Sequence, residues 1–111
     1  MIDEPICSKL SVDSVCGVLS NGCRRSVLYH LDASSSDVFT RDELADHLVA
    51  ADTEYEDRER ALVQLHHTTL PMLEDVGVIE YDSRSNVIRY RSDPLLDQFL
   101  SLSAAVEKPT E

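Results

Sequence analysis

The chain reads Leu65-His66-His67-Thr68-Thr69-Leu70-Pro71-Met72-Leu73-Glu74-Asp75-Val76-Gly77-Val78-Ile79-Glu80-Tyr81 across the join between a predicted helix and a predicted strand. Apolar residues recur at helical spacing up to Val76, which predicts an amphipathic helix over about 57–76. Gly77 follows where helices commonly end with a glycine. Alternating residues then predict a β-hairpin, with strands at 78–81 and 87–90 and a turn at 82–86. A helix therefore runs into a hairpin with almost no linker.

Shorter helices are predicted on both sides of this segment. Ser11 can cap a helix over about 12–20, and Asn21 can cap another over 22–31. Thr40-Arg41-Asp42-Glu43 is a capping box that starts a third helix over 41–50, just after a very short strand at 38–39. A last amphipathic helix is predicted over 94–106. The fold class is thus mainly α with a small β-hairpin (α+β), a winged helix-turn-helix with an additional C-terminal helix.

The predicted organisation has four parts. Residues 1–10 are a flexible N-terminal arm, 11–92 the winged helix-turn-helix domain, 93–106 a C-terminal dimerisation helix and 107–111 a disordered tail.

Two features complicate the prediction of the long helix. The connection at 51–56 is longer than a tight helix-turn-helix turn. Pro71 has no amide to bond the His67 carbonyl, so we expect a kink or break near Leu70, or two helices that meet there.

The charge balance is strongly acidic. The chain has 21 acidic and 10 basic residues, a formal net charge of −11, and its only lysines are Lys9 and Lys108. Such a surface is typical of proteins from salt-in halophiles, because carboxylates stay solvated while molar salt screens their repulsion within ~3 Å. Acidity alone would disfavour DNA binding, but in molar salt counterion release contributes little, so shape and base contacts matter more.

The location that the sequence favours is the cytosol. No apolar run approaches the roughly 20 residues of a membrane span, so we expect no membrane partner. The N-terminus lacks the basic and apolar regions of a signal peptide.

Several segments resemble a known family. The run from Thr68 to Ile79 resembles the end of the recognition helix in arsenic-repressor-type (ArsR-like) winged-helix regulators, and Ser20 to Leu31 resembles their second helix. The string Leu65-His66-His67, followed by Leu70-Pro71 and Leu73, is closer still to small haloarchaeal winged-helix proteins. The resemblance covers residues 11–92 and implies a homodimeric transcription regulator. The paired cysteines of metal-sensing members are lacking.

The expected function is sequence-specific binding of double-stranded DNA by a homodimer, with the recognition helix at about 57–76 and the wing at about 78–91. The candidate DNA contacts are Arg60, Gln64, His67 and Thr68 on the helix, Arg84, Arg89 and Arg91 on the wing, and Arg24 and Arg25. The last two could equally pair with an acidic side chain such as Asp32 or Asp37. The candidate dimer contacts are apolar: Val12, Val15, Leu19, Leu95, Leu96, Phe99, Leu100 and Leu102.

Two other functions remain open. Winged helices also serve as protein-interaction modules without DNA binding, and a net charge of −11 suits that role. A thiol redox sensor would use Cys7 or Cys23, whereas Cys16 is expected in the core. His66 is expected to be a hydrogen-bonded core histidine, and the spacing of the cysteines and histidines does not suit zinc. We expect no metal, no cofactor, no catalytic residue and no enzyme activity.

Overall fold

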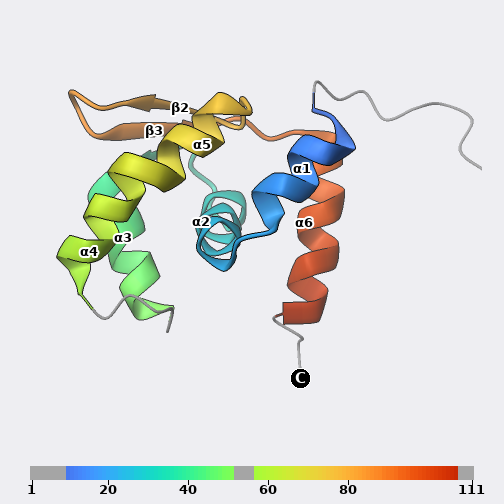
Figure 1. Cartoon of the computed structure of the whole chain (residues 1–111), viewed down its shortest axis with the longest axis horizontal. Helices are drawn as coiled ribbons and strands as arrows, with labels where there is room; N and C mark the ends of the chain where they lie inside the picture. Colours follow the sequence, from blue (N-terminus) through green and yellow to red (C-terminus); the bar gives the residue numbers. More distant parts are fainter. Residues whose placement is uncertain (1–9, 52–56, 108–111) are drawn as a thin grey trace, which may run out of the picture.

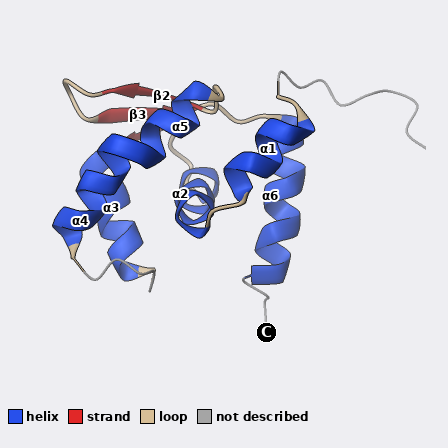
Figure 2. Cartoon of the chain, viewed as in Figure 1, coloured by secondary structure: helices blue, strands red, loops and turns tan. Residues whose placement is uncertain are grey.

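The computed structural model describes residues 10–51 and 57–107, which form helices around a small sheet (Figures 1 and 2). The helices are α1 (Val12–Leu19), α2 (Gly22–Ala33), α3 (Arg41–Ala50), α4 (Arg58–Gln64), the π-helical segment η1 (Leu65–Thr69), α5 (Leu70–Asp75) and α6 (Pro94–Glu107). The strands are β1 (Val38–Thr40), β2 (Ile79–Asp82) and β3 (Val87–Tyr90). The predicted α+β class, mainly helical with a small hairpin, is confirmed.

The helix starts follow from side chains that cap them. Ser11 accepts the backbone N–H of Ser14, Asn21 that of Arg24 and Thr40 that of Glu43, each at 3.0–3.1 Å. The Glu43 carboxylate, expected to complete a capping box, instead lies 2.8 Å from His30 Nε2. These caps confirm the predicted starts of the first three helices.

The sheet is antiparallel, with strand order β1-β3-β2. The hairpin pairs Tyr81 with Ile88, and the short predicted strand at 38–39 is confirmed as β1, which pairs Phe39 with the same Ile88. In Figure 1, α3, α4 and the hairpin turn lie at one end of the molecule, and α1 and α6 lie at the other. The central α2 lies between the two ends.

The hydrophobic core is formed by buried apolar side chains from the helices and from the sheet. Leu28 and Leu31 of α2 are buried together with Leu44 and Leu48 of α3 and with Ile88 of β3. Helix α1 contributes Val15 and Val18, which lie one turn apart. The expectation that Cys16 belongs to the core is wrong: its side chain is exposed. The buried side of α1 contains Val15 and Val18, and the Cys16 side chain lies outside that buried side.

The proline-containing helix continues without a break. Leu70 keeps helical φ and ψ of −67° and −43°, and its N–H bonds the Leu65 carbonyl five residues back, as in a π-helix. The π segment widens the helix in the turn where a regular α-helix would bring the Pro71 ring against the His67 carbonyl. The expected disturbance near Leu70 is thus present as a change of hydrogen bonding.

The sequence predicts that the helix ends at Val76, with Gly77 as its C-terminal cap; α5 ends at Asp75, and Gly77 follows the last turn. This glycine has a φ of +88°, which an L side chain rarely adopts. Its N–H bonds the Glu74 carbonyl, and the N–H of Val78 bonds the Leu73 carbonyl, so the chain turns at once into β2.

The remaining predicted boundaries concern the chain ends and one loop. Most of the predicted arm at 1–10 and of the loop at 51–56 lies outside the described residues. Glu107 is not part of a disordered tail but the last residue of α6, because it bonds Arg25 and Tyr29. Residues 108–111 also lie outside the described part.

Candidate nucleic-acid interface and the α1–α6 face

The outward face of the long helix contains the predicted DNA contacts. Arg60, His67 and Thr68 are exposed, whereas Gln64 is half-buried. Val63, which the sequence did not single out, is 58% exposed on the same helix. The π segment contributes both His67 and Thr68, so the irregular turn presents polar side chains to solvent.

The three arginines predicted on the wing differ in position and in ion pairing. Arg84 lies exposed at the turn, where its backbone N–H bonds Asp82 Oδ1 at 3.0 Å. Arg89 is exposed on β3, opposite Glu80 in the strand register. The Glu80 carboxylate pairs with Arg91. Glu80 thus forms its ion pair with Arg91 and not with Arg89, the residue opposite it in the register.

The arginines divide into two groups by their contacts. The side chains of Arg24, Arg25, Arg41, Arg58 and Arg91 all bond other parts of the fold. Within residues 10–51 and 57–107, the side chains of Arg60, Arg84 and Arg89 have no hydrogen-bond or ion-pair partner. These three cations lie on α4 and the hairpin, at the same end of the molecule (Figure 1).

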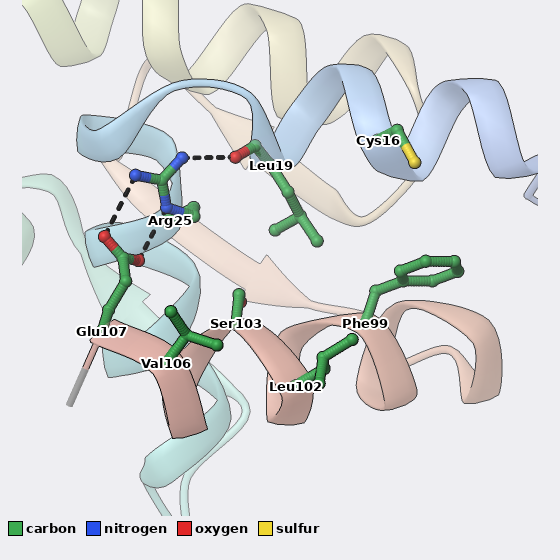
Figure 3. Close-up of a pocket in the computed structure, with 8 residues that line it drawn as sticks. All are labelled: Cys16, Leu19, Arg25, Phe99, Leu102, Ser103, Val106 and Glu107. Carbon is green, nitrogen blue, oxygen red and sulfur yellow. Dashed lines mark hydrogen bonds and ion pairs between the residues drawn. The ribbon is translucent and has the colours of Figure 1, made fainter. Parts of the chain in front are cut away.

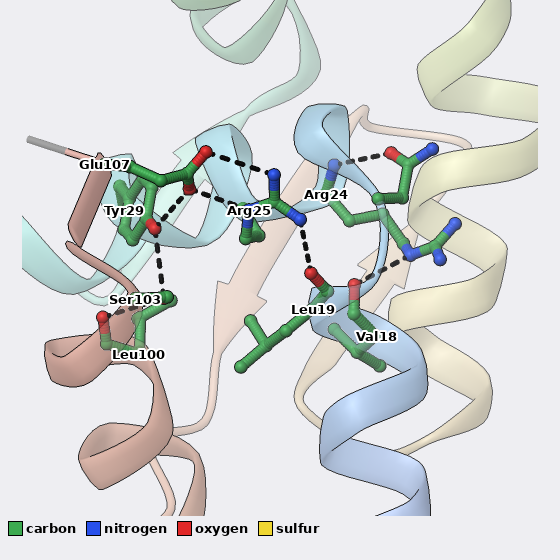
Figure 4. A network of polar contacts seen from close by, with 9 residues as sticks. Val18, Leu19, Arg24, Arg25, Tyr29, Leu100, Ser103 and Glu107 are labelled. Carbon is green, nitrogen blue, oxygen red and sulfur yellow. Dashed lines mark hydrogen bonds and ion pairs between the residues drawn. The ribbon is translucent and has the colours of Figure 1, made fainter.

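Arg24 and Arg25 lie at the junction of α1 and α2 (Figure 4). Arg24 donates to the carbonyls of Val18 and Gly17, each at 3.0 Å, and so satisfies the end of α1. Arg25 donates to both oxygens of Glu107 at 2.7 and 3.0 Å and to the Leu19 carbonyl. The partners suggested from the sequence, Asp32 and Asp37, are therefore not the ones that the structure uses.

A polar network joins α2 to the end of α6 in the same place. The Tyr29 hydroxyl lies 2.7 Å from Glu107 Oε1 and 3.0 Å from Ser103 Oγ (Figure 4). Burial raises the pKa of the Tyr29 hydroxyl, while its bond to Ser103 lowers it. The network fixes the last turn of α6 on α2.

Next to this network, an apolar groove of about 400 Å³ runs between α1 and α6 (Figure 3). Its apolar lining comes from Cys16, Leu19, Phe99, Leu102 and Val106. Arg25 and Glu107 lie at one end, already paired with each other. Val12, Leu102 and Val106 are 53%, 65% and 73% exposed, so much apolar surface on these two helices is uncovered. We call the exposed apolar surface formed by these residues the α1–α6 face.

The structure changes the set of candidate dimer contacts. Val15, Leu96 and Leu100 are buried inside one chain, because α6 packs on α1 and α2, and they cannot face a second copy. Val12 and Leu102 remain exposed, and Leu19, Leu95 and Phe99 are half-buried. Val106, outside the predicted set, is as exposed as any of them.

A polar cluster lies behind the π segment, and sequence reasoning found only one of its members. His66 Nδ1 lies 2.9 Å from the Tyr81 hydroxyl and 3.2 Å from Arg41 Nη1, and Arg41 Nη1 lies 3.3 Å from the same hydroxyl. The prediction of a hydrogen-bonded His66 is confirmed, although the residue is half-buried. No local pattern could reveal Arg41 and Tyr81, because they are far from His66 in the sequence.

The other histidines and cysteines do not assemble a metal site in the described part of the chain, where no group of three or more such ligands lies together. His30 and His47 have ring centroids 4.6 Å apart, with His30 bonded to Glu43 and His47 to Ser26. Cys23 is half-buried with its sulfur 3.8 Å from Thr69 Oγ1. Cys7 lies outside the described residues.

These features define a small α+β domain with an exposed helix-and-hairpin surface at one end and an apolar helical face at the other. The chain belongs to the family described as a domain of unknown function (DUF7344), whose model matches residues 16–89. The matched region runs from α1 to β3 and leaves α6 outside it. No curated protein and no solved structure matches the chain. None of the helices in the described ranges is long and apolar enough to cross a membrane.

Proposed function

We propose that the protein is a winged-helix DNA-binding transcription regulator that acts as a homodimer. The observation that carries the proposal is where the unpaired cations lie. In a chain with a formal net charge of −11, Arg60, Arg84 and Arg89 have no side-chain partner in the described residues, and all three lie on α4 or the hairpin. Arginine is the side chain most used to contact phosphates and guanine edges.

The proposed contact surface combines a major-groove helix and a wing. Arg60, Gln64, His67 and Thr68 would face base edges and phosphates, and Arg84 and Arg89 would contact the adjacent backbone or minor groove. We leave Arg24, Arg25 and Arg91 out of this surface, because their guanidinium groups are bonded within the fold. No catalytic role is proposed.

The arrangement of elements supports this reading. Two helices, a strand, the helix α3, the continuous helix α4–η1–α5 and a hairpin follow in the order typical of winged-helix domains, and the sheet order β1-β3-β2 agrees with it. The resemblance of Thr68 to Ile79 to ArsR-like recognition helices, and of the Leu65–Leu73 region to haloarchaeal winged-helix proteins, points the same way. A DNA-binding role also fits the cytosolic location expected from the sequence.

Self-association through the α1–α6 face supports the homodimer. Residues 98–106 of α6 contain no charged side chain, and Asp13 is the only charged residue of α1. Two molecules of net charge −11 repel each other across acidic surfaces, so an uncharged apolar face is where they can approach. A two-fold dimer would present two helix-and-hairpin surfaces to two half-sites.

The test is a selection of genomic DNA fragments by the purified protein in molar KCl, with sequencing of the bound DNA. We expect enrichment of a short palindromic site. Arg84→Gln should weaken binding to that site about tenfold and reduce the salt slope by roughly one unit, because one phosphate contact is lost. Gln64→Ala should weaken binding most at one base position.

Arg24→Gln is the matched control. It removes the same charge, but Arg24 bonds the end of α1 away from the hairpin. Its affinity should stay within about twofold of the wild type if local contacts, rather than total charge, determine binding. Failure of the folded wild-type protein to enrich any site would contradict the proposal.

A second candidate function is a protein-interaction module. The observation that favours it is the apolar α1–α6 groove, which would bind a protein partner instead of a second copy. A protein of this kind would tolerate Arg84→Gln and Gln64→Ala, yet lose its partner when Phe99 is made polar.

A further inference from the structure

We propose that Arg41, His66 and Tyr81 form a positioning unit that holds the hairpin and the π segment in the arrangement required for DNA binding. The inference rests on the proposed DNA-binding function. It assigns a role to side chains that do not themselves belong to the proposed contact surface.

The unit connects three elements at one point. Arg41 is the first residue of α3, His66 belongs to η1 and Tyr81 to β2, and all three are half-buried. The backbone N–H of Arg41 also bonds the carbonyl of Asn86, in the hairpin turn, at 2.9 Å. Movement of the hairpin relative to the helix would therefore break several hydrogen bonds at once.

The geometry requires a neutral His66. A guanidinium only donates hydrogen bonds, so Nδ1 must keep its lone pair to accept from Arg41 or from the Tyr81 hydroxyl. The ring proton is then on Nε2. A second proton on His66 would remove this acceptor and place an imidazolium beside the guanidinium of Arg41.

The positive charge of Arg41 is left without an acidic partner in the described part of the chain. Its side chain is bonded to two neutral groups, and its Nε is buried with no partner there. Arg25, Arg58 and Arg91 pair with carboxylates, whereas Arg41 is enclosed by neutral groups. A cation at the junction of helix and hairpin adds to the attraction of that surface for phosphate.

The other charged or titratable groups around His66 are few. His67, its neighbour in η1, has its ring centroid 4.9 Å from that of His66 and is exposed. Glu74 of α5 accepts the backbone N–H of Tyr81 at 3.2 Å.

The experiment measures DNA affinity at neutral pH for four proteins: wild type, His66→Ala, His66→Asn and His30→Asn. The DNA is the site enriched by the wild type. His66→Ala should bind about tenfold more weakly, because Arg41 and Tyr81 lose their shared acceptor. His66→Asn keeps an acceptor oxygen near the Nδ1 position and should restore binding.

Rescue by His66→Asn separates positioning from a merely structural role, because asparagine replaces the hydrogen-bond acceptor without replacing the imidazole ring. The control His30→Asn removes a histidine bonded to Glu43 in another part of the fold and should keep the wild-type affinity.

Two different failures can be told apart. If the wild type binds DNA but His66→Ala, folded by circular dichroism, binds as tightly, the positioning unit is refuted and the proposed function stands. If the wild type binds no DNA, both are overturned.

Discussion

At the scale of single residues, Asp97 lies in an environment that disfavours its charge. Burial is the main reason that the pKa of the Asp97 carboxyl is raised, and the nearby carboxylates of Asp32 and Asp93 raise it further. Its Oδ1 is buried without a hydrogen-bond partner in the described residues. Burial also raises the pKa of Tyr90, whose hydroxyl lies 3.3 Å from Asp32 Oδ1. Charge repulsion is therefore concentrated where α2, β3 and α6 meet.

The raised pKa predicts how stability changes with pH. The folded protein holds the Asp97 proton more tightly than the unfolded chain, so this residue lowers the free energy of unfolding as pH rises through its folded pKa. Asp97→Asn should raise the free energy of unfolding at neutral pH by less than about 1 kcal/mol, since the side chain is partly exposed. Urea unfolding at neutral pH and near pH 4 measures this.

The free energies of unfolding of the wild type and of Asp97→Asn should converge as pH falls. The advantage of the asparagine should shrink as pH falls toward the ordinary aspartate pKa of 3.8, because the folded wild type binds the Asp97 proton more tightly than the unfolded chain does. A stabilisation that is the same at both pH values would mean that the charge of Asp97 is not the cause.

At the scale of elements, the π segment allows one helix to meet two packing requirements. Ala61 and Leu65 are buried in the first half of the continuous helix, and Leu70 and Leu73 are buried in its second half. Leu65 and Leu70 are five residues apart, a spacing that a regular α-helix would turn to different faces. The π turn brings both into the core and leaves His67 and Thr68 exposed. Single π turns inside helices are frequent at functional sites.

This account predicts a small effect of Pro71→Ala on stability. A proline in a regular helix interior costs about 3 kcal/mol, and its removal would stabilise the protein by that amount. Here the helix has already widened, and burial of Leu65 and Leu70 keeps it so. We expect the free energy of unfolding to change by less than about 1 kcal/mol, as measured by urea unfolding. A gain near 3 kcal/mol would show that the proline strains the wild-type helix.

Local signals predicted most elements, and non-local contacts explain the failures. Caps at Ser11, Asn21 and Thr40 and the glycine at 77 mark helix ends through bonds to near neighbours, so the sequence reveals them. Partners distant in sequence are not visible in this way. The pairing of Arg25 with Glu107 and that of Arg41 with His66 depend on how whole helices pack. The same reason applies to Val15, Leu96 and Leu100, whose apolar character fits a dimer contact and a core position equally.

At the scale of the whole molecule, the two proposed surfaces lie at opposite ends. The helix and hairpin with unpaired arginines are at the end that contains α3 and α4, and the apolar α1–α6 face is at the other (Figure 1). Binding of a second copy would therefore leave the proposed DNA surface of each copy free. A net charge of −11 makes both associations depend on salt, in different ways. Salt weakens attraction to phosphate but screens the repulsion between two acidic copies.

Self-association should consequently tighten as salt rises, and it should depend on the exposed apolar residues of α6. We expect sedimentation velocity to show a dimer that is favoured by molar KCl and dissociates at low salt, where the carboxylates of two copies repel. Leu102→Asp should weaken the dimer by about tenfold or more in molar KCl, because a charge would be buried against an apolar partner surface. Met72→Asp adds the same charge at an exposed position of α5, outside the α1–α6 face, and should leave the dimer intact in that salt. If both variants dissociate equally, net charge rather than the α1–α6 face controls association, and a wild type that stays monomeric at every salt concentration would remove the homodimer from the proposal.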